Sequence, residues 1–439
     1  MSQYRPLSAV VLAAGEGTRM RSGTPKVLHS LCGRPMLLHV VDALAELPLA
    51  RIVIVVGHAA ERVTKTLHEQ LVTEVPVEFV EQRVQRGTGD AMSVALSVFE
   101  DLDAEDDILV LPGDTPLLRA ETMARLATEH RVQDAAATVL TARIADPAGY
   151  GRIVRDKNDY IARIVEHVDA TPEDRGIDEV NTSIYCFRRN LLAPALRRLS
   201  PENVQGEYYL TDAIEVLSSA GHKVVALDAA DGVEALGVND RVQLADAEAE
   251  LRVRINQRWM RDGVTMVDPA RTYIDATVEL DPDVRLLPGV LLEGRTSIGT
   301  GSTIGPDCHL VDTVVGERSV VKLAVTRDAE IGDECEVGPF AYLRPGTRLA
   351  TGVKIGTYVE VKNSEIGDGT KIPHLSYVGD ADVGAGANLG ASTITANYDG
   401  RAKHRTTIGD GVHTGVHTSL VAPVEVGERA ETGAGSVVT

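Results

Sequence analysis

Cysteine is scarce in this chain, and its spacing excludes two common uses of the residue. The four cysteines, Cys32, Cys186, Cys308 and Cys335, lie far apart in the 439-residue sequence. They form no CxxC pair, and no Cys/His spacing is typical of a zinc site. Scattered cysteines of this kind are more typical of buried free thiols in a reducing compartment than of disulfide bonds. We therefore expect neither disulfides nor structural zinc.

The chain also lacks long hydrophobic runs and an excess of basic residues. The N-terminal sequence MSQYRPLSAVVLAAG has no basic region followed by a long apolar core, and SAVVLAA is about one strand long. We therefore expect a cytosolic protein without a signal peptide or membrane span. Lys and Arg total 44 against 64 Asp and Glu, a net charge of −20. This balance opposes a general binder of nucleic acid or anionic membranes, and solubility is its simplest explanation.

Aromatic residues are only 4% of the sequence, with one Trp and four Phe, whereas hydrophobic residues make up 44%. The cores must therefore consist largely of Val, Ile, Leu and Ala. A chain of 439 residues is too long for one ordinary core, so two domains are expected.

Residues 1–239 alternate short β-branched runs with longer helical stretches. SAVVLAAG, RIVIVVG and DDILVLPGD each have the composition of a buried strand that ends in Gly or Asp. Alternation of strands and helices predicts an α/β domain with an open, mostly parallel, Rossmann-like sheet. Ligands of such sheets bind beyond the carboxyl ends of the strands, where these Gly and Asp residues fall.

The pattern changes after residue 239. Residues 240–262 are predicted to form one charged amphipathic linker helix that closes at Gly263. From 263 to 439 an aliphatic residue recurs every six positions and Gly often follows it. One such series is Ile331, Val337, Leu343, Leu349, Ile355 and Val361. A period of six is the hexapeptide pattern of a parallel β-helix.

A Gly-rich segment, LAAGEGTRM (12–20), follows the first predicted strand and should open a helix. Gly15 and Gly17 would let backbone N–H groups approach a triphosphate closely. Arg19 and Lys26 would add positive charge where pyrophosphate leaves. The spacing matches neither GxGxxG nor a P-loop, so neither a dinucleotide fold nor a P-loop is indicated.

Two polar segments, HLSYVGDADVG (374–384) and ITANYDGRAKH (394–404), interrupt the hexapeptide repeat. Arg344 and Lys362 lie eighteen residues apart, about one coil, so they should stack on one face and form a positive pocket for a phosphate. Tyr377 falls near the same face one coil further on, and His374 lies nearby in sequence. A β-helix that serves only as a scaffold needs none of these residues for folding.

The segment LAAGEGTRM with the downstream Pro25-Lys26 resembles the signature of the sugar-nucleotide pyrophosphorylases. Taken with the hexapeptide repeat, nearly the whole chain resembles the bacterial bifunctional N-acetylglucosamine-1-phosphate uridyltransferases/glucosamine-1-phosphate acetyltransferases. The resemblance implies a nucleotidyltransferase domain followed by a left-handed parallel β-helix, and an enzyme that makes UDP-N-acetylglucosamine for peptidoglycan and the cell envelope. UTP and acetyl-CoA would be its co-substrates.

The resemblance also implies a first site with Mg²⁺ held by Asp114 and Asn239. Lys26 and Arg19 would neutralise charge as the sugar phosphate attacks the α-phosphorus of UTP. The residues implied to bind UTP or the UDP-sugar are Leu12, Ala13, Ala14, Gly15, Lys26, Gln82, Gly87, Thr88, Gly113, Asp114, Gly151, Glu166, Asn181 and Asn239.

In the second implied site, His374 would be the general base for acetyl transfer to the sugar amine. The resemblance places four residues on glucosamine 1-phosphate: Arg344, Lys362, Tyr377 and Asn388. It places six at acetyl-CoA: Ala391, Asn397, Tyr398, Lys403, Val416 and Ala434. The segment 396–407 breaks the repeat as a loop toward a neighbouring chain would, and a homotrimer with sites between subunits is implied.

The sequence departs from the family pattern in four places. Glu16 replaces a residue that is commonly basic, and Pro112 stands where Tyr is frequent. Val416 replaces a Ser that would contact acetyl-CoA, and the chain ends at Thr439, where family members continue with a basic tail. The last two departures predict weak acetyl transfer.

Two other functions remain open from the residues. The chain could be a single-activity sugar-1-phosphate nucleotidyltransferase whose β-helix is an oligomerisation scaffold, although the segments 374–384 and 394–404 argue against this. It could also be a non-catalytic regulatory subunit, although Lys26 and Asp114 are both present.

Overall fold

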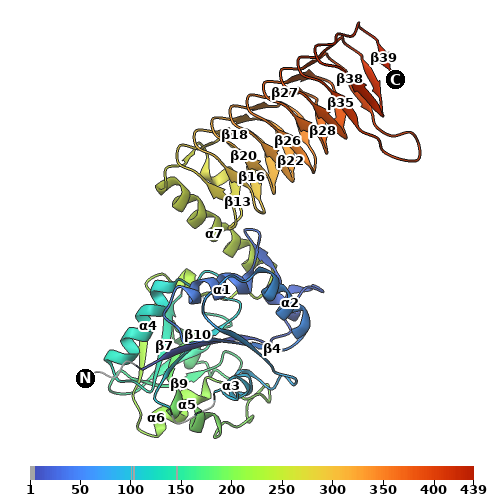
Figure 1. Ribbon diagram of the computed structural model, residues 1–439. Helices are drawn as coiled ribbons and strands as arrows, with labels where there is room; N and C mark the ends of the chain where they lie inside the picture. The colour runs from blue at the N-terminus through green and yellow to red at the C-terminus, as the bar shows by residue number, and fades with distance from the viewer. Residues whose placement is uncertain (1–4, 100, 102–103, 145–146) are drawn as a thin grey trace. The chain divides into compact units, whose positions relative to one another are not determined.

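The computed structural model describes residues 5–99, 101, 104–144 and 147–439. Contacts divide the chain into two compact units, Met1–Glu248 and Ala249–Thr439. Figure 1 shows a layered α/β unit and a long parallel β-helix. No described helix is long and apolar enough to span a membrane.

The first unit is built on a nine-stranded sheet in which seven strands follow the order β11-β7-β10-β6-β1-β4-β5. Only β10 runs antiparallel to its neighbours in this order. The strands are β1 (Leu7–Ala13), β4 (Ile52–Val56), β5 (Val77–Glu81), β6 (Asp107–Pro112), β7 (Ala137–Arg143), β10 (Glu179–Arg188) and β11 (Val224–Asp228), with β8 (Arg152–Arg155) and β9 (Ile161–Val165) at the side of β10.

Helices cover both faces of this sheet because successive strand residues point to opposite sides. Ala9 and Val11 of β1 belong to one buried cluster, while Val10 belongs to the other. The first cluster is covered by α1 (Met36–Ala45), α2 (Ala60–Gln70) and α4 (Ala120–Val132). The second is covered by α3 (Thr88–Leu96), α5 (Arg189–Leu196) and α6 (Asp212–Ser219).

A 21-residue helix, α7 (Arg241–Arg261), follows the last strand of this unit. The C-terminal part of α7 belongs to the second unit and binds the start of the β-helix. There the buried Asn256 amide donates to the carbonyl oxygens of Pro269 and Thr272 at 2.9 and 3.0 Å.

The second unit is a triangular coil with three parallel sheets. The sheets run from β12 (Thr265–Met266) to β36 (His413–Thr414), from β13 (Thr272–Ile274) to β39 (Val437–Val438), and from β14 (Glu279–Leu280) to β38 (Val424–Val426). The six aliphatic residues of the series Ile331 to Val361 are all buried. The predicted fold class, an α/β nucleotidyltransferase-like domain followed by a left-handed parallel β-helix, is confirmed.

One coil is longer than the others. Ile366 pairs with Val383, seventeen residues on, whereas Val383 pairs with Ile408, twenty-five residues on. The extra residues form the loop between β34 (Ile394–Ala396) and β35 (Thr406–Ile408), which projects from the β-helix in Figure 1. The predicted break of the repeat at 396–407 is therefore confirmed.

Candidate functional site

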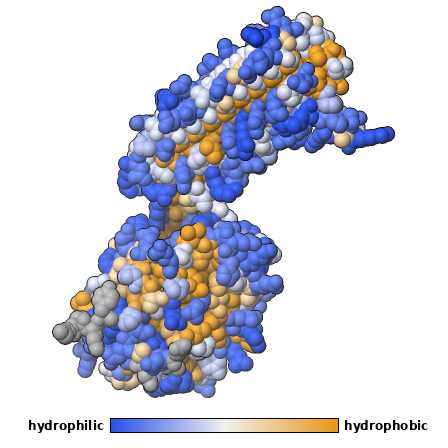
Figure 2. Space-filling model, viewed as in Figure 1, coloured by the Kyte–Doolittle hydropathy of each residue, from blue (hydrophilic) through white to orange (hydrophobic). Residues whose placement is uncertain are grey.

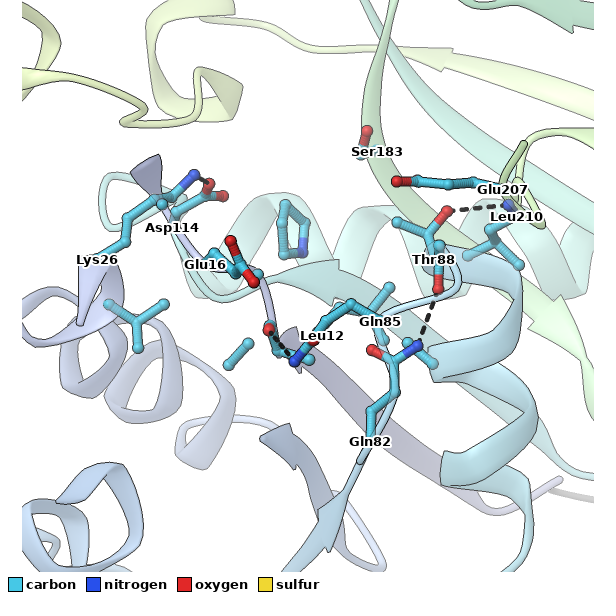
Figure 3. Close-up of a pocket in the computed structure, with 18 of the residues that line it drawn as sticks. Leu12, Glu16, Lys26, Gln82, Gln85, Thr88, Asp114, Ser183, Glu207 and Leu210 are labelled. Carbon is cyan, nitrogen blue, oxygen red and sulfur yellow. Dashed lines mark hydrogen bonds and ion pairs between the residues drawn. The ribbon is translucent and has the colours of Figure 1, made fainter. Parts of the chain in front are cut away.

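A cavity of about 620 Å³ opens at the carboxyl ends of β1 and β6 (Figure 3). It gathers segments that are far apart in the sequence, from the loop after β1 to the residues before α6. Its lining is Leu12, Ala13, Ala14, Gly15, Glu16, Gly17, Thr18, Lys26, Val27, Gln82, Gln85, Gly87, Thr88, Ala91, Pro112, Asp114, Glu166, Ser183, Tyr185, Glu207, Leu210 and Thr211.

The Gly-rich loop forms one wall of this cavity. Gly17 has φ +65, and a Cβ there would lie 2.5 Å from the Cβ of Lys26, so the close approach of these segments requires glycine. The prediction of a helix after this loop is wrong. The chain forms only a three-residue 3-10 turn, Thr18–Met20, because Gly17 and Arg21 on either side are left-handed. The loop therefore offers backbone N–H groups but no long helix dipole.

At one end of the cavity Lys26 bridges the two predicted metal ligands. Its Nζ forms an ion pair with Asp114, which follows β6, and donates to Asn239 Oδ1 at 2.8 Å. Arg19 donates to the same Asn239 oxygen at 2.9 Å. The structure therefore brings together all four residues that the sequence assigned to phosphate and metal.

The donor set of Asp114 and Asn239 suits Mg²⁺, which binds through one or two protein oxygens, waters and substrate phosphates. The contact of Lys26 with both residues shows that a cation fits between their oxygens. Over the described ranges, no group of three or more His, Cys, Asp or Glu side chains could hold a metal ion. A metal at this site would therefore rely on substrate oxygens.

The predicted uracil-binding residues lie along another wall and are held in place by hydrogen bonds. The Gln82 side chain is buried and donates to Gly87 O at 3.1 Å and to Asp90 Oδ2 at 2.8 Å. Gly87 has φ +104 and leaves no room for a Cβ beside the Tyr208 backbone. The orientation of the Gln82 amide is thus fixed before any ligand binds.

The predicted sugar-binding residues gather near β8 and β10. A Cβ on Gly151 would lie 3.5 Å from both Asn181 Cβ and Glu166 Oε2, which places the three residues side by side. Asn181 donates to the Tyr185 hydroxyl at 2.8 Å, and Glu166 accepts from Thr211 at 3.0 Å. Burial raises the Glu166 pKa, and the nearby Asp212 and Asp169 charges raise it further.

Five of the predicted first-site residues lie beside the cavity and not in its lining: Arg19, Gly113, Gly151, Asn181 and Asn239. Gly113 packs against the end of β1, and its N–H donates to Leu12 O at 2.9 Å. Sequence reasoning missed other residues that line the cavity, among them Gln85, Ser183, Tyr185, Glu207, Leu210 and Thr211. They come from the loop before α3, a bulge in β10 and the loop before α6, whose paths no local pattern predicts.

The β-helix brings together residues of its predicted site through strand register. Leu343 pairs with Val361, so Arg344 and Lys362 stack one coil apart, as predicted. On the next coil, the residue that pairs with Lys362 is Gly379. Tyr377 lies two positions before it and pairs with Glu360. A Cβ on Gly379 would collide with the Tyr377 ring, so the ring lies over this glycine and reaches the level of Lys362.

Acidic residues pair with both cations of the predicted phosphate pocket. Arg344 donates to Glu360 at 2.7 Å, and Lys362 lies 3.7 Å from Asp380. Asp380, which the sequence did not single out, also accepts from Asn397 at 2.5 Å. Burial raises the Asp380 pKa, but hydrogen bonds from its neighbours and the Lys362 charge outweigh burial and leave the pKa lowered.

The other predicted acetyl-transfer residues lie on successive coils. His374 ends β30 (Lys371–His374) with an exposed side chain. Asn397 also lies 3.4 Å from the Tyr377 hydroxyl, and Lys362 lowers the pKa of nearby Lys403. Tyr398 and Lys403 pair as a bridge in the projecting loop. The remaining four lie on strands and turns and are exposed or half-buried: Asn388, Ala391, Val416 and Ala434.

A family model of nucleotidyltransferases matches most of the first unit. Residues 9–210 match the family described as the MobA-like NTP transferase domain. Among solved structures, HddC from Yersinia pseudotuberculosis complexed with GMP-PN is similar at a TM-score of 0.42 and 16% identity, over 56% of this chain and 99% of HddC.

Full-length relatives define the family. The chain is 51% identical to the bifunctional protein GlmU of Thermobifida fusca, over 100% of this chain and 90% of the relative. It is 49% identical to that of Streptomyces avermitilis (100% and 90%) and 48% identical to that of Brevibacillus brevis (98% and 92%). The chain therefore belongs to the family of bifunctional GlmU proteins.

Proposed function

We propose that the chain synthesises UDP-N-acetylglucosamine in two steps. Acetyl-CoA first acetylates the amine of glucosamine 1-phosphate, and UTP then uridylylates N-acetylglucosamine 1-phosphate with release of pyrophosphate. The single observation that carries this function is 48–51% identity to bifunctional GlmU proteins over 98–100% of the chain. The product would feed peptidoglycan and other envelope polymers, and the enzyme would work in the cytoplasm.

We assign the first reaction to residues 263–439 and the second to residues 1–239, with 240–262 as the linker. For uridylyl transfer, an oxygen of the sugar phosphate attacks the α-phosphorus of UTP in line with the departing pyrophosphate. Backbone N–H groups of the Gly-rich loop hold the phosphates, and Arg19 and Lys26 offset their charge. Mg²⁺, held by Asp114 and Asn239, would supply further neutralisation of the phosphate oxygens.

The remaining first-site residues orient the two substrates. The Gln82 amide, fixed by Asp90, would bind the uracil edge together with Gly87 and Thr88. Gly151, Glu166 and Asn181 would bind the acetylated sugar. Positioning of this kind supplies much of the rate in phosphoryl transfer, so no covalent nucleophile is required.

Substitution Asp114→Ala tests the metal and phosphate end of this site. We expect uridylyl transfer, followed as pyrophosphate release with Mg²⁺, to fall at least about 100-fold because one carboxylate ligand is lost. Acetyl transfer should be unchanged. Asp246→Ala, an exposed position in α7, is the matched control. Unchanged pyrophosphate release in Asp114→Ala would contradict the assignment.

For acetyl transfer, His374 takes a proton from the sugar amine as the amine attacks the thioester. Arg344, Lys362, Tyr377 and Asn388 would hold glucosamine 1-phosphate, and Asn397 would steady the oxyanion or the amine. The acetyl-CoA residues would be Ala391, Asn397, Tyr398, Lys403, Val416 and Ala434.

Substitution His374→Ala should lower acetyl transfer by about 100-fold or more, because the general base is lost, and leave uridylyl transfer intact. His413→Ala, an exposed histidine of the same sheet, is the control. Equal acetyl transfer by His374→Ala and wild type would instead favour the β-helix as a scaffold for a single-activity nucleotidyltransferase.

We also propose a homotrimer formed through the β-helix. Three bulky residues, Phe340, Tyr358 and Leu375, are exposed on successive coils although each has a positive φ, and the first two rings stack at 5.3 Å. Figure 2 shows apolar residues along the displayed face of the β-helix. A ladder with the period of the coil can meet the same ladder of two further copies around a three-fold axis that runs along the β-helix.

Sedimentation of the full chain tests this assembly. We expect a mass three times 46.9 kDa for the wild type and dissociation for the double substitution Phe340→Asp, Tyr358→Asp, whose like charges would face one another. A folded wild-type chain that stays monomeric at micromolar concentration contradicts the trimer.

A further inference from the structure

Strand β10 contains a bulge that turns one side chain into the cavity. Its register against β7 shifts between Asn181 and Tyr185. Ser183 lies in this interval with φ +62, and its side chain is exposed while Thr182 and Ile184 on either side are buried. Bulges of this kind commonly redirect a side chain next to a binding site.

The left-handed backbone at Ser183 is strained for a residue with a Cβ, and the surrounding hydrogen bonds maintain it. The Ser183 N–H donates to Asn181 Oδ1 at 3.1 Å, and the other end of the same amide donates to Tyr185 Oη at 2.8 Å. Asn181 therefore fixes both the bulge and the buried tyrosine. Glycine would adopt the same φ without strain, so the serine side chain at this position lowers the stability of the fold.

The part of the cavity that Ser183 enters suits sugar hydroxyls better than phosphates. Ser183 and Glu207 line the same cavity, and Figure 3 shows both of them apart from Lys26 and Asp114. Glu166 lines the same cavity. Carboxylates repel a phosphate but accept hydrogen bonds from sugar hydroxyls, and a neutral hydroxyl among them can donate to a sugar oxygen.

The Tyr185 phenol leaves the Ser183 proton available for a ligand. Tyr185 is 2% exposed, and burial raises its pKa well above the usual range; the Glu166 charge raises it further, and hydrogen bonds with Asn181 and Ser183 oppose the rise. The phenol is therefore neutral, and because its oxygen accepts from Asn181, its own proton can be donated to the Ser183 oxygen. In that arrangement the Ser183 hydrogen is left for a ligand in the cavity.

We propose that Ser183 is a specificity-determining residue of the first site, whose hydroxyl donates a hydrogen bond to a hydroxyl oxygen of the sugar 1-phosphate. This inference rests on the proposed uridylyl transfer and adds a contact to it. Ser183 would contact neither the uracil nor the triphosphate of UTP.

Two substitutions separate the hydroxyl from the backbone. Ser183→Ala removes the hydroxyl and keeps the strain, whereas Ser183→Gly removes both. We expect both to raise KM for N-acetylglucosamine 1-phosphate about fivefold, the effect of one neutral hydrogen bond, with KM for UTP and kcat unchanged. Only Ser183→Gly should also raise the melting midpoint, by about 2–4 °C.

Ala59→Gly is the matched control, because Ala59 has φ +58, carries only a methyl group and does not line the cavity. It should raise the melting midpoint without changing either KM. An unchanged sugar-phosphate KM in Ser183→Ala, or a rise confined to UTP, overturns the proposal. A wild-type chain that forms no UDP-sugar means that the proposed function has failed. Calorimetric binding of N-acetylglucosamine 1-phosphate to the wild type and to Ser183→Ala then still decides whether Ser183 contacts the sugar.

Discussion

At the scale of single residues, the Lys26 ammonium occupies the place that is predicted for a metal ion. Its contacts with Asp114 and Asn239 occupy both predicted ligands. We expect a nucleoside triphosphate to draw Lys26 toward its own oxygens, which would free Asp114 and Asn239 to hold Mg²⁺. Metal and nucleotide should therefore bind cooperatively.

Substitution Lys26→Met tests this competition. We expect Mn²⁺ binding without nucleotide, followed by electron paramagnetic resonance, to tighten at least about threefold because the competing charge is gone. Asp114→Asn should weaken the same binding. Mn²⁺ affinity that is equal or lower in Lys26→Met would contradict the competition, whatever happens to turnover.

Glu16 places a carboxylate in the wall that should hold phosphates. Its repulsion of UTP is expected to cost about 1 kcal/mol in a partly solvated site. Glu16→Gln should therefore lower KM for UTP about fivefold at low salt, and the gain should shrink as added salt screens the charges. Steady-state kinetics at two ionic strengths measure both effects. Equal KM values for the two proteins at low salt would place the carboxylate away from the phosphates.

Asp212, at the start of α6, gives a pH dependence of stability. Burial, followed by the charges of Glu215 and Asp169, raises its pKa to about 6. A folded pKa above the unfolded value of about 3.9 means that ionisation destabilises the fold progressively as pH rises through this interval. The gain in melting midpoint from Asp212→Asn should therefore grow between pH 4.5 and 7.5. A gain that is constant or shrinks over this range contradicts the raised pKa.

At the scale of elements, β31 (Tyr377–Gly379) positions the Tyr377 ring over a glycine. Gly379→Ala would displace the ring and its hydroxyl from the level of Lys362. We expect acetyl transfer to fall about tenfold or more while uridylyl transfer stays unchanged. Gly427→Ala is the control, since its Cβ would meet no atom within 4 Å. Full acetyl transfer by Gly379→Ala would show that the ring position is unimportant.

The repeating elements could be predicted from sequence, and the irregular ones could not. A period of six residues directly encodes inward positions such as Val337 and Leu343, which are buried as predicted. The helix expected after the Gly-rich loop is absent because left-handed Gly17 and Arg21 end the turn. Asp380 and the bulge at Ser183 depend on contacts between coils or strands, which no local pattern contains.

The candidate sites, like the fold, could be predicted from the sequence only in part. The sequence identified Lys26, Asp114 and Asn239, which the structure brings together from three separate segments. It did not identify the acidic partner of Arg344, because Glu360 comes from the next coil. The catalytic and binding roles of these residues stay predictions until substitutions test them.

At the scale of the whole molecule, each unit contains a buried core and one of the two candidate sites. All residues that line the first cavity lie within Met1–Glu248, and the residues predicted for acetyl transfer lie within Ala249–Thr439. The fold class and the family are confirmed, and the family carries two activities in one chain. If the two sites are independent, each substitution should abolish only one of the two proposed reactions. A mixture of Asp114→Ala and His374→Ala chains should then make UDP-N-acetylglucosamine from glucosamine 1-phosphate, which neither chain makes alone.

The most direct test of the two-step function is one incubation of the wild-type chain with glucosamine 1-phosphate, acetyl-CoA, UTP and Mg²⁺, with products identified by mass spectrometry. Our account predicts UDP-N-acetylglucosamine, CoA and pyrophosphate. A reaction that yields UDP-N-acetylglucosamine only when N-acetylglucosamine 1-phosphate is supplied directly would contradict the bifunctional assignment.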